Sequence, residues 1–102
     1  MASLDRYIVS TPGTRGGKPR IADRRITVAD VAIMHVRQGM PVAKIVADYD
    51  LELAAVHAAL AYYYLHQDAI DRSIEEDRAF GEEFRRENPS LVRGKLQPSA
   101  GR

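Results

Sequence analysis

The chain has 102 residues, contains no cysteine and carries a formal net charge of +1. A single domain of this length has a modest core and is too small for a deep enclosed substrate pocket, and a chain without cysteine has neither disulfides nor thiolate metal sites. No apolar run approaches the about 18 residues of a membrane span and no basic-then-apolar signal begins the chain, so we expect a cytoplasmic protein without a membrane partner.

Basic residues gather at the N-terminal end of the chain. Residues 1–27 hold six Arg or Lys against two acids, whereas residues 28–71 hold two against six. A basic segment of this kind contacts phosphates or an acidic protein surface, or else it is a solvated arm. Both interpretations stay open at the level of the sequence.

A short β-hairpin is predicted in this basic segment. The apolar residues Tyr7–Val9 precede and Ile21 follows the segment Gly16–Pro19, in which the glycines permit positive φ and the proline fixes φ. We therefore expect a shaped turn between two very short strands. Thr27–Asp30 then has the form of a capping box, in which a hydroxyl and a carboxylate cover free amides at a helix start.

Helical patterns fill most of the chain after the capping box. Residues 28–38 are apolar on nearly every side, so this helix is expected at the centre of the core, and Gly39 suits its end. A short helix over residues 42–48 and a turn over residues 49–51 precede a longer helix that starts near residue 52. This order is typical of a helix-turn-helix domain. The expected fold is mainly α, with an N-terminal β-hairpin, a helix-turn-helix core and a C-terminal amphipathic helix.

The longer helix has a predicted inward face. Its members, at helical spacing, are Leu53, Val56, Leu60, Tyr63 and Gln67. Residues 1–67 are therefore expected to form the hairpin and helix-turn-helix domain. Tyr62 and Tyr64 leave the helix in other directions from Tyr63, and either one is suited to a dimer contact, since tyrosine offers a large area with a polar tip.

A charged amphipathic helix is predicted over residues 68–88. Its apolar members fall within roughly 120° of one another on a helical wheel. They are Ile70, Ile74, Phe80 and Phe84. Residues 89–102 contain no acidic residue and few apolar side chains. They are therefore expected to form a flexible partner-binding tail that cannot fold alone. An idle tail is the alternative.

Several motifs together carry a family resemblance. They are Gly16–Pro19, Ile21, Arg25–Val28, Gly39, Ile45, Asp48–Tyr49, Val56 and Ala59–Tyr63. With these motifs, the stretch from about residue 8 to residue 71 resembles small bacterial helix-turn-helix proteins that were first catalogued as a domain of unknown function and are mostly described as VapB-type antitoxins. The resemblance implies a dimeric antitoxin that inhibits a PIN-like ribonuclease and commonly binds its own operator.

The chain departs from this family at two places. Asp23-Arg24 stands where the family usually has Gly-Thr; aspartate tolerates left-handed backbone, so the turn is expected to survive with added charge. Base readout relies on Arg, Lys, Asn or Gln near the start of a recognition helix, whereas residues 52–57 offer only Glu52 and His57 as polar side chains. Any DNA contact would then fall to the basic segment. The predicted DNA-binding residues are Arg15, Lys18, Arg20, Arg24 and Arg25.

Two hypotheses of different classes remain. In the first, the chain is a type II antitoxin that forms a homodimer and docks its last helix and tail on a PIN-like ribonuclease toxin. The predicted dimer residues are Tyr7, Ile8, Val9, Ile21 and Tyr62. The predicted toxin-binding residues are Phe80, Phe84, Leu91, Val92, Arg93, Lys95 and Leu96. In the second, a stand-alone DNA-binding regulator uses the basic segment, with strongly salt-dependent binding to operator DNA.

Catalysis and metal binding have little support in the sequence. His35, His57 and His66 lack the spacing of three or four residues that places two ligands on one helical face. His35 is expected to be a hydrogen-bonded core histidine instead. No serine lies in a nucleophile motif and no glycine run forms a phosphate-binding loop. We expect no enzyme activity, no catalytic residue, no metal and no cofactor.

Overall fold

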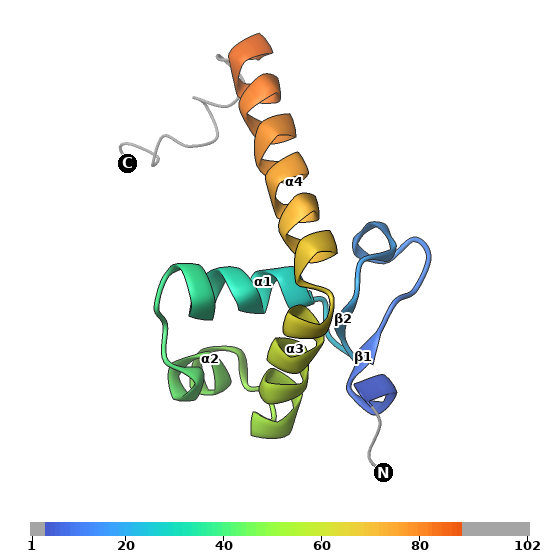
Figure 1. Ribbon diagram of the computed structural model, residues 1–102, viewed down its shortest axis with the longest axis vertical. Helices are drawn as coiled ribbons and strands as arrows, with labels where there is room; N and C mark the ends of the chain where they lie inside the picture. Colours follow the sequence, from blue (N-terminus) through green and yellow to red (C-terminus); the bar gives the residue numbers. More distant parts are fainter. Residues whose placement is uncertain (1–3, 89–102) are drawn as a thin grey trace, which may run out of the picture. The chain divides into compact units, whose positions relative to one another are not determined.

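The computed structural model describes residues 4–88. The chain divides into two compact units with the boundary after Asp71, and each unit is described by itself. The elements of the first unit (Figure 1) are η1 (Leu4–Arg6), β1 (Ile8–Val9), η2 (Arg15–Gly17), β2 (Arg20–Ile21), α1 (Val28–Ala32), η3 (Ile33–Arg37), α2 (Val42–Tyr49), α3 (Leu53–Leu65) and the first turn of α4 (Gln67–Glu87). The remainder of α4 belongs to the second unit.

The predicted hairpin is confirmed. β1 and β2 pair in antiparallel register, with Ile8 opposite Ile21. Gly16 and Gly17 in the connecting segment have φ of 68° and 78°, which a side chain would strain, and this accounts for the pair of glycines. Asp23 has φ of 64°, so the left-handed turn after β2 survives with aspartate in place of glycine.

The capping box at the start of α1 is also confirmed. The Asp30 amide donates to Thr27 Oγ1 at 2.9 Å, and the Thr27 amide donates to Asp30 Oδ2 at 3.0 Å. Thr27 is 1% exposed, so its hydroxyl is shielded from water at the junction of the hairpin and the first helix, whereas the Asp30 carboxylate is about one-third exposed. The box fixes where the helical part of the chain begins.

The helix predicted over residues 28–38 is built from two kinds of turn. α1 continues as η3, a π-helix in which the Gln38 amide donates to the Ile33 carbonyl five residues earlier, at 3.0 Å. His35 Nδ1 lies 2.8 Å from the Met40 carbonyl oxygen, a hydrogen bond in keeping with the role predicted for this histidine, although its side chain is only half-buried. Val36 is 41% exposed, so the prediction that this helix is buried on nearly every side is wrong for its second half. The wider π-turns rotate these side chains away from the positions that a 3.6-residue period assigns.

A helix-turn-helix forms the middle of the first unit. α2 ends at Tyr49 and is capped by Asp50, which has φ of 53°, and α3 begins three residues after Asp50. α3 contacts α1, α2 and both strands, so it is the central helix around which the others pack (Figure 1). The largest fully buried side chains are contributed by these elements and the capping box. They are Ile45, Val28, Val31, Val56 and Thr27.

The predicted inward face of α3 is partly wrong. Val56, Leu60 and Tyr63 are buried, but Leu53 is 55% exposed and Gln67 is exposed and lies in α4 rather than α3. The buried arc of α3 is centred on Val56, Ala59 and Tyr63, because α1 and the hairpin pack against that side. The spacing of apolar residues could not predict which side of α3 is buried, because α3 is apolar on all sides.

A break at His66 separates α3 from α4. His66 has φ of −127° and ψ of 36°, and its amide donates to the carbonyls of Tyr62 and Tyr63. The sequence-based boundary at residues 67–68 coincides with the start of α4, whereas contacts group Gln67–Asp71 with the first unit. Among residues 4–88, no helix combines the length and apolar character needed to cross a membrane.

Candidate functional site

The arginines of the basic segment are largely committed to contacts within the chain. Arg15 Nη1 donates to the Arg25 carbonyl at 2.6 Å and to Asp30 Oδ2 at 3.2 Å. It thereby joins the hairpin loop to the capping box of α1. The salt bridge with Asp30 is about one-third exposed, so water screens it and its contribution to stability is small.

Arg20 lies inside its own turn. Its Nη1 donates to the Arg24 carbonyl at 2.8 Å, and its Nη2 donates to Thr11 Oγ1 at 3.0 Å. The remaining guanidinium nitrogen, Nε, is buried without a hydrogen-bond partner in the described part of the chain. A side chain held in this way fixes the turn after β2 and has little capacity left for a phosphate.

Arg24 connects the hairpin to the helix-turn-helix. Its Nη1 donates to the Tyr49 carbonyl at 2.9 Å, and its Nη2 donates to the Asp50 carbonyl. These carbonyls are the last of α2 and the first of the α2–α3 turn, where a helix has no backbone donors of its own. A cation here also interacts favourably with the helix dipole. The Arg24 side chain therefore caps the C-terminal end of α2.

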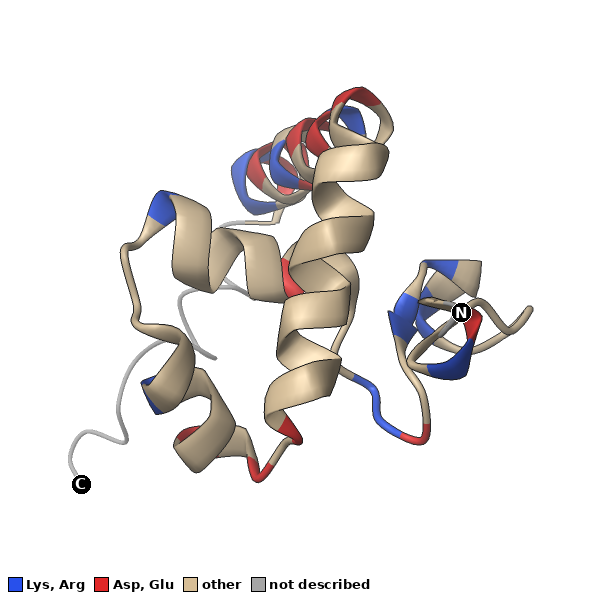
Figure 2. Ribbon diagram, turned by 60° about the horizontal axis from the view of Figure 1, so that its bottom comes forward, with Lys and Arg blue, Asp and Glu red and all other residues tan. Residues whose placement is uncertain are grey.

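The other two predicted DNA-binding residues differ from these three. Lys18 is half-buried and interacts with other residues of the chain. Arg25 is exposed, and its side chain makes no hydrogen bond or ion pair within residues 4–88. Figure 2 shows basic residues gathered on the hairpin and acidic ones at the turn between α2 and α3. The five residues thus share one region, but three of them donate hydrogen bonds to other groups of the same chain, which could not be predicted from local sequence patterns.

Arg24 and Arg25 provide a matched pair for separating these roles. We expect Arg24→Ala to lower the free energy of unfolding by about 1–2 kcal/mol, because the α2 carbonyls lose charged donors at a solvent-accessible site. We expect Arg25→Ala to change it by less than about 0.5 kcal/mol. Urea unfolding of both variants measures the difference, and equal stability of the two would contradict the capping role.

A shallow pocket of about 320 Å³ lies beside the Arg24 contact. Its apolar lining includes Ile21, Leu51 and Ala55, while Arg6 and Arg24 lie among the charged residues at its wall. Asp23, Asp50 and Glu52 also line it, so neither sign of charge dominates. Among residues 4–88, no group of three or more His, Asp or Glu side chains is arranged to hold a metal ion.

The predicted dimer residues lie on and beside the hairpin. Ile8 and Ile21 are 6% and 3% exposed, because they face one another in the strand pair and pack into the chain's own core. Tyr7, Val9 and Tyr62 are half-buried and keep part of their side chains accessible. A contact between copies at this place would therefore have to use these three side chains and the strand edges.

A hydrogen-bonded cluster ties the end of α3 to the first turn of α4. The Tyr63 hydroxyl donates to Asp71 Oδ1 at 2.8 Å, and Arg37 Nη2 lies 3.4 Å from the same oxygen. Burial raises the pKa of Tyr63, and the hydrogen bond to Asp71 raises that pKa further. The phenol is thus held neutral, as a donor to the carboxylate.

Tyr63 gives the protein an alkaline pH dependence. The folded-state pKa lies above the unfolded value of about 10, so the stability that Tyr63 contributes is fully present below about pH 10 and is lost as pH rises through the folded pKa. We expect Tyr63→Phe to cost about 1 kcal/mol at pH 7 and less above pH 10. Denaturant unfolding of both proteins from pH 7 to 11 checks this, and a constant difference across the range would contradict it.

α4 carries two exposed aromatic side chains. Ile70 and Ile74, early in its apolar stripe, are 6% and 7% exposed, whereas Phe80 and Phe84 are 72% and 41% exposed. The rest of this part of α4 is charged, with Arg78 paired to Glu75 and Glu82 and Arg86 paired to Glu83. The other predicted toxin-binding residues lie outside the described residues. They are Leu91, Val92, Arg93, Lys95 and Leu96.

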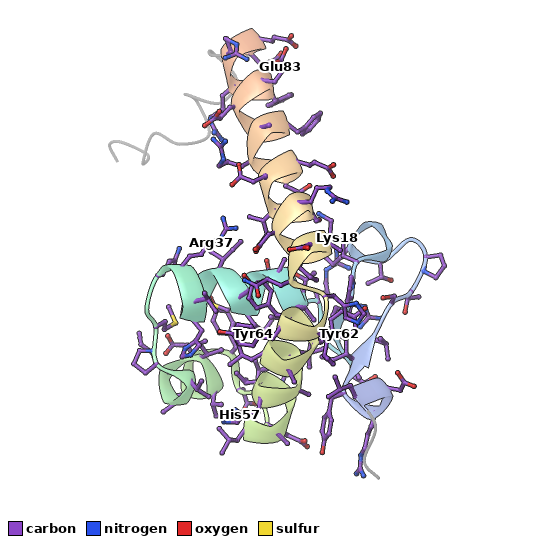
Figure 3. All side chains as sticks on the ribbon, viewed as in Figure 1. Lys18, Arg37, His57, Tyr62, Tyr64 and Glu83 are labelled. Atoms are coloured by element: carbon purple, nitrogen blue, oxygen red, sulfur yellow. The ribbon has the colours of Figure 1, made fainter. Side chains whose placement is uncertain are left out.

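The sequence analysis missed a second exposed apolar face, on α3. This face contains no Lys, Arg, Asn or Gln, although it belongs to the second helix of the helix-turn-helix, which reads bases in DNA-binding members of that fold. Its exposed members are Leu53, Ala54, His57, Ala61, Tyr64 and Leu65. Tyr62 and Tyr64 leave α3 on opposite sides, so Tyr64 belongs to this face and Tyr62 to the hairpin side (Figure 3). The absence of charge on all sides of α3 was the signal that could have identified it.

Comparison with known proteins supports the placement of the chain in one family. Residues 8–63 match the family described as "Protein of unknown function (DUF433)". The crystal structure of a DUF433 member protein from Anabaena variabilis is similar to this structure, with a TM-score of 0.63 and 36% sequence identity over 71% of each chain. No curated protein gives a match.

Proposed function

The chain belongs to the DUF433 family, whose function is unknown, and on that premise we propose that it is a type II antitoxin that binds and inhibits a PIN-like ribonuclease. The observation that carries the proposal is the exposed pair Phe80 and Phe84 on an otherwise charged helix. Large aromatic side chains are costly to leave in water and are enriched where one protein anchors in another. The sequence resemblance to VapB-type antitoxins supplies the class of partner.

The geometry of α4 supports a helix-in-groove contact. Phe80 and Phe84 are one helical turn apart and therefore lie on one face, as anchor residues of a groove-binding helix do. Arg78 and Arg86 are already paired with acids on the same helix. The exposed aromatic pair is therefore the surface of α4 that is best suited to bind another protein. A ribonuclease groove lined by apolar side chains would accept both rings at once.

The segment after α4 supplies the charge that a PIN-like active site attracts. Residues 90–102 contain Arg93, Lys95 and Arg102 and no acid. Nucleases of this class hold a divalent metal with clustered carboxylates, so a basic side chain is suited to occupy that cluster. We assign this inhibitory contact to Arg93 or Lys95.

Operator DNA is the second candidate partner. The exposed Arg25 on the hairpin favours it, since its guanidinium is available to a phosphate. Against a stand-alone regulator stand the internal hydrogen bonds of Arg15, Arg20 and Arg24 and the uncharged outer face of α3. Protein binding is therefore the function that the geometry supports better.

Co-purification with the product of the adjacent reading frame tests the proposal. The untagged chain is expected to elute with the tagged ribonuclease in a fixed ratio, and RNA cleavage is expected only after the chain is removed. The variant Arg93→Ala/Lys95→Ala is expected to stay bound but to inhibit less, which separates docking from active-site blockage. The opposite outcome is that no complex forms, that the isolated chain shifts promoter DNA, and that Arg25→Ala weakens this shift. That outcome would contradict the antitoxin hypothesis and support the stand-alone regulator.

A further inference from the structure

We propose that the outer face of α3 is the contact between two copies of this chain, with the two α3 helices antiparallel. The face consists of the six exposed residues of α3 given above, and it is distinct from both the hairpin surface and the ribonuclease-binding face of α4. The proposal does not depend on the identity of any other partner. It follows from the composition, the spacing and the area of this face.

The composition of α3 indicates that a second surface must cover it. α3 has no Lys, Arg, Asp or Glu over its 13 residues. Its inner side is buried by α1, α2 and the hairpin, yet its outer side presents Leu53, Tyr64 and Leu65 at 55%, 58% and 72% exposure. A helix that is apolar all round is normally buried all round. In residues 4–71 only one side of α3 is covered.

The spacing of the exposed residues identifies a second copy as the occupant. Positions 53, 54, 57, 61, 64 and 65 are symmetric about position 59, so reversing the helix direction reproduces the same pattern. In an antiparallel pair centred there, Leu53 meets Leu65 of the other copy, and Ala54 meets Tyr64. His57 meets Ala61 in the same register. A face that matches its own reverse is what a twofold contact requires.

The sizes of the paired residues also fit. A tyrosine opposite an alanine and a histidine opposite an alanine place each large side chain against a small one, so the two surfaces can interdigitate. The two alanines on the outer face let the helix axes approach closely near the centre. The leucines then close both ends of the contact, and the hydroxyl of Tyr64 is placed toward the solvent at the rim.

The area of the face is sufficient for a specific dimer. With about 150–250 Å² for a whole tyrosine side chain, the three large residues expose roughly 300–400 Å² at the fractions given above. Adding the alanines and His57 brings the face to about 500 Å² per copy, so two copies bury about 1,000 Å², the size at which specific interfaces begin. Exposed apolar patches of this size often serve as binding surfaces.

A charge in the face tests the contact. Leu53→Glu places a carboxylate against Leu65 of the other copy at both ends of the twofold contact, and we expect it to raise the dimer dissociation constant about a hundredfold or more. Because Leu53 is 55% exposed and glutamate is favourable in the first turn of a helix, the fold is expected to persist. Ala47→Glu on α2 is the control, since Ala47 is also exposed but lies off the face. Sedimentation equilibrium on the full chain measures both.

Cysteine cross-linking tests the antiparallel register, and the natural chain has no cysteine to interfere. Two copies of Leu53→Cys hold their thiols about 18 Å apart along the helices, too far for a disulfide, whereas Leu53→Cys mixed with Leu65→Cys brings them together. We expect oxidation to join only the mixed pair. A cross-link of Leu53→Cys to itself would indicate a parallel arrangement and overturn the proposal.

Three further results would also overturn it. One is a full-length chain that is monomeric at 100 µM or more (about the weak end of specific association). A second is a dimer that Leu53→Glu and Ala47→Glu weaken equally. The third is a monomeric chain in which Leu53→Glu abolishes ribonuclease binding, because the face would then belong to the ribonuclease rather than to a second copy.

Discussion

Replacing Phe80 and Phe84 together with alanine is expected to weaken binding to the proposed ribonuclease partner about a hundredfold or more. Aromatic anchors that fill a partner's pocket contribute on the order of 2 kcal/mol each, and about 1.4 kcal/mol corresponds to a factor of ten in affinity. Because these rings are 72% and 41% exposed in the chain alone, their removal is expected to leave the stability of the free chain nearly unchanged. Calorimetric titration of the ribonuclease with each variant measures the loss.

Arg86→Ala is the matched control for this prediction. Arg86 is exposed on α4 and lies on the side of the helix opposite to the two aromatic rings. Its only described partner is Glu83 on the same helix, so its loss is expected to cost well under 1 kcal/mol in stability and little in affinity. If this variant and the double phenylalanine variant lose affinity equally, α4 does not bind through its aromatic face.

Ile45→Ala is expected to have the largest effect on stability, a loss of about 3 kcal/mol in the free energy of unfolding. Ile45 is 0% exposed and is the one buried residue of α2, so its side chain carries the packing of that helix on α3. Truncating a buried isoleucine removes apolar contacts and leaves a cavity, at a cost of about 2–5 kcal/mol. For a folded unit of this size, the melting temperature is expected to fall by roughly 10–20 °C.

Val36→Ala is the comparison variant for the core. Val36 is aliphatic like Ile45 but is 41% exposed, so its truncation is expected to cost less than about 1 kcal/mol. Thermal unfolding followed by circular dichroism measures both variants under one set of conditions. A loss for Ile45→Ala as small as that expected for Val36→Ala would mean that α2 is held by interactions other than the packing of Ile45.

Features that depend on neighbouring residues were predictable from the sequence. The capping box of Thr27 and Asp30 and the left-handed turn at Asp23 arise from contacts within a few positions, and the hairpin pairs strands that are adjacent in the sequence. Helix ends followed from the glycine and the turn residues in the same way, and the element order of the fold was therefore correct. The aromatic pair on α4 was identified by its helical spacing, although its exposure came only with the structure.

Features that depend on distant residues were not predictable. The role of Arg24 depends on carbonyls 25 and 26 positions later, so its charge was interpreted as a phosphate contact. The second half of the first helix is the π-helix η3 rather than a regular α-helix, and its Val36 is exposed rather than in the core. Both differences arise from packing between elements, which no local pattern encodes.

The sequence by itself determined that the chain forms a mainly helical fold. It also determined the positions of the turns and helix caps and the charge of the two ends of the chain. Only the tertiary structure decided which side of α3 is buried and which arginines are available to a partner. α3 is apolar all round, so its sequence fits either orientation equally well, and the choice was made by the surfaces of α1, α2 and the hairpin that pack on it. Local interactions act over a few residues along the chain, whereas orientation and availability are set by neighbours that only folding brings together.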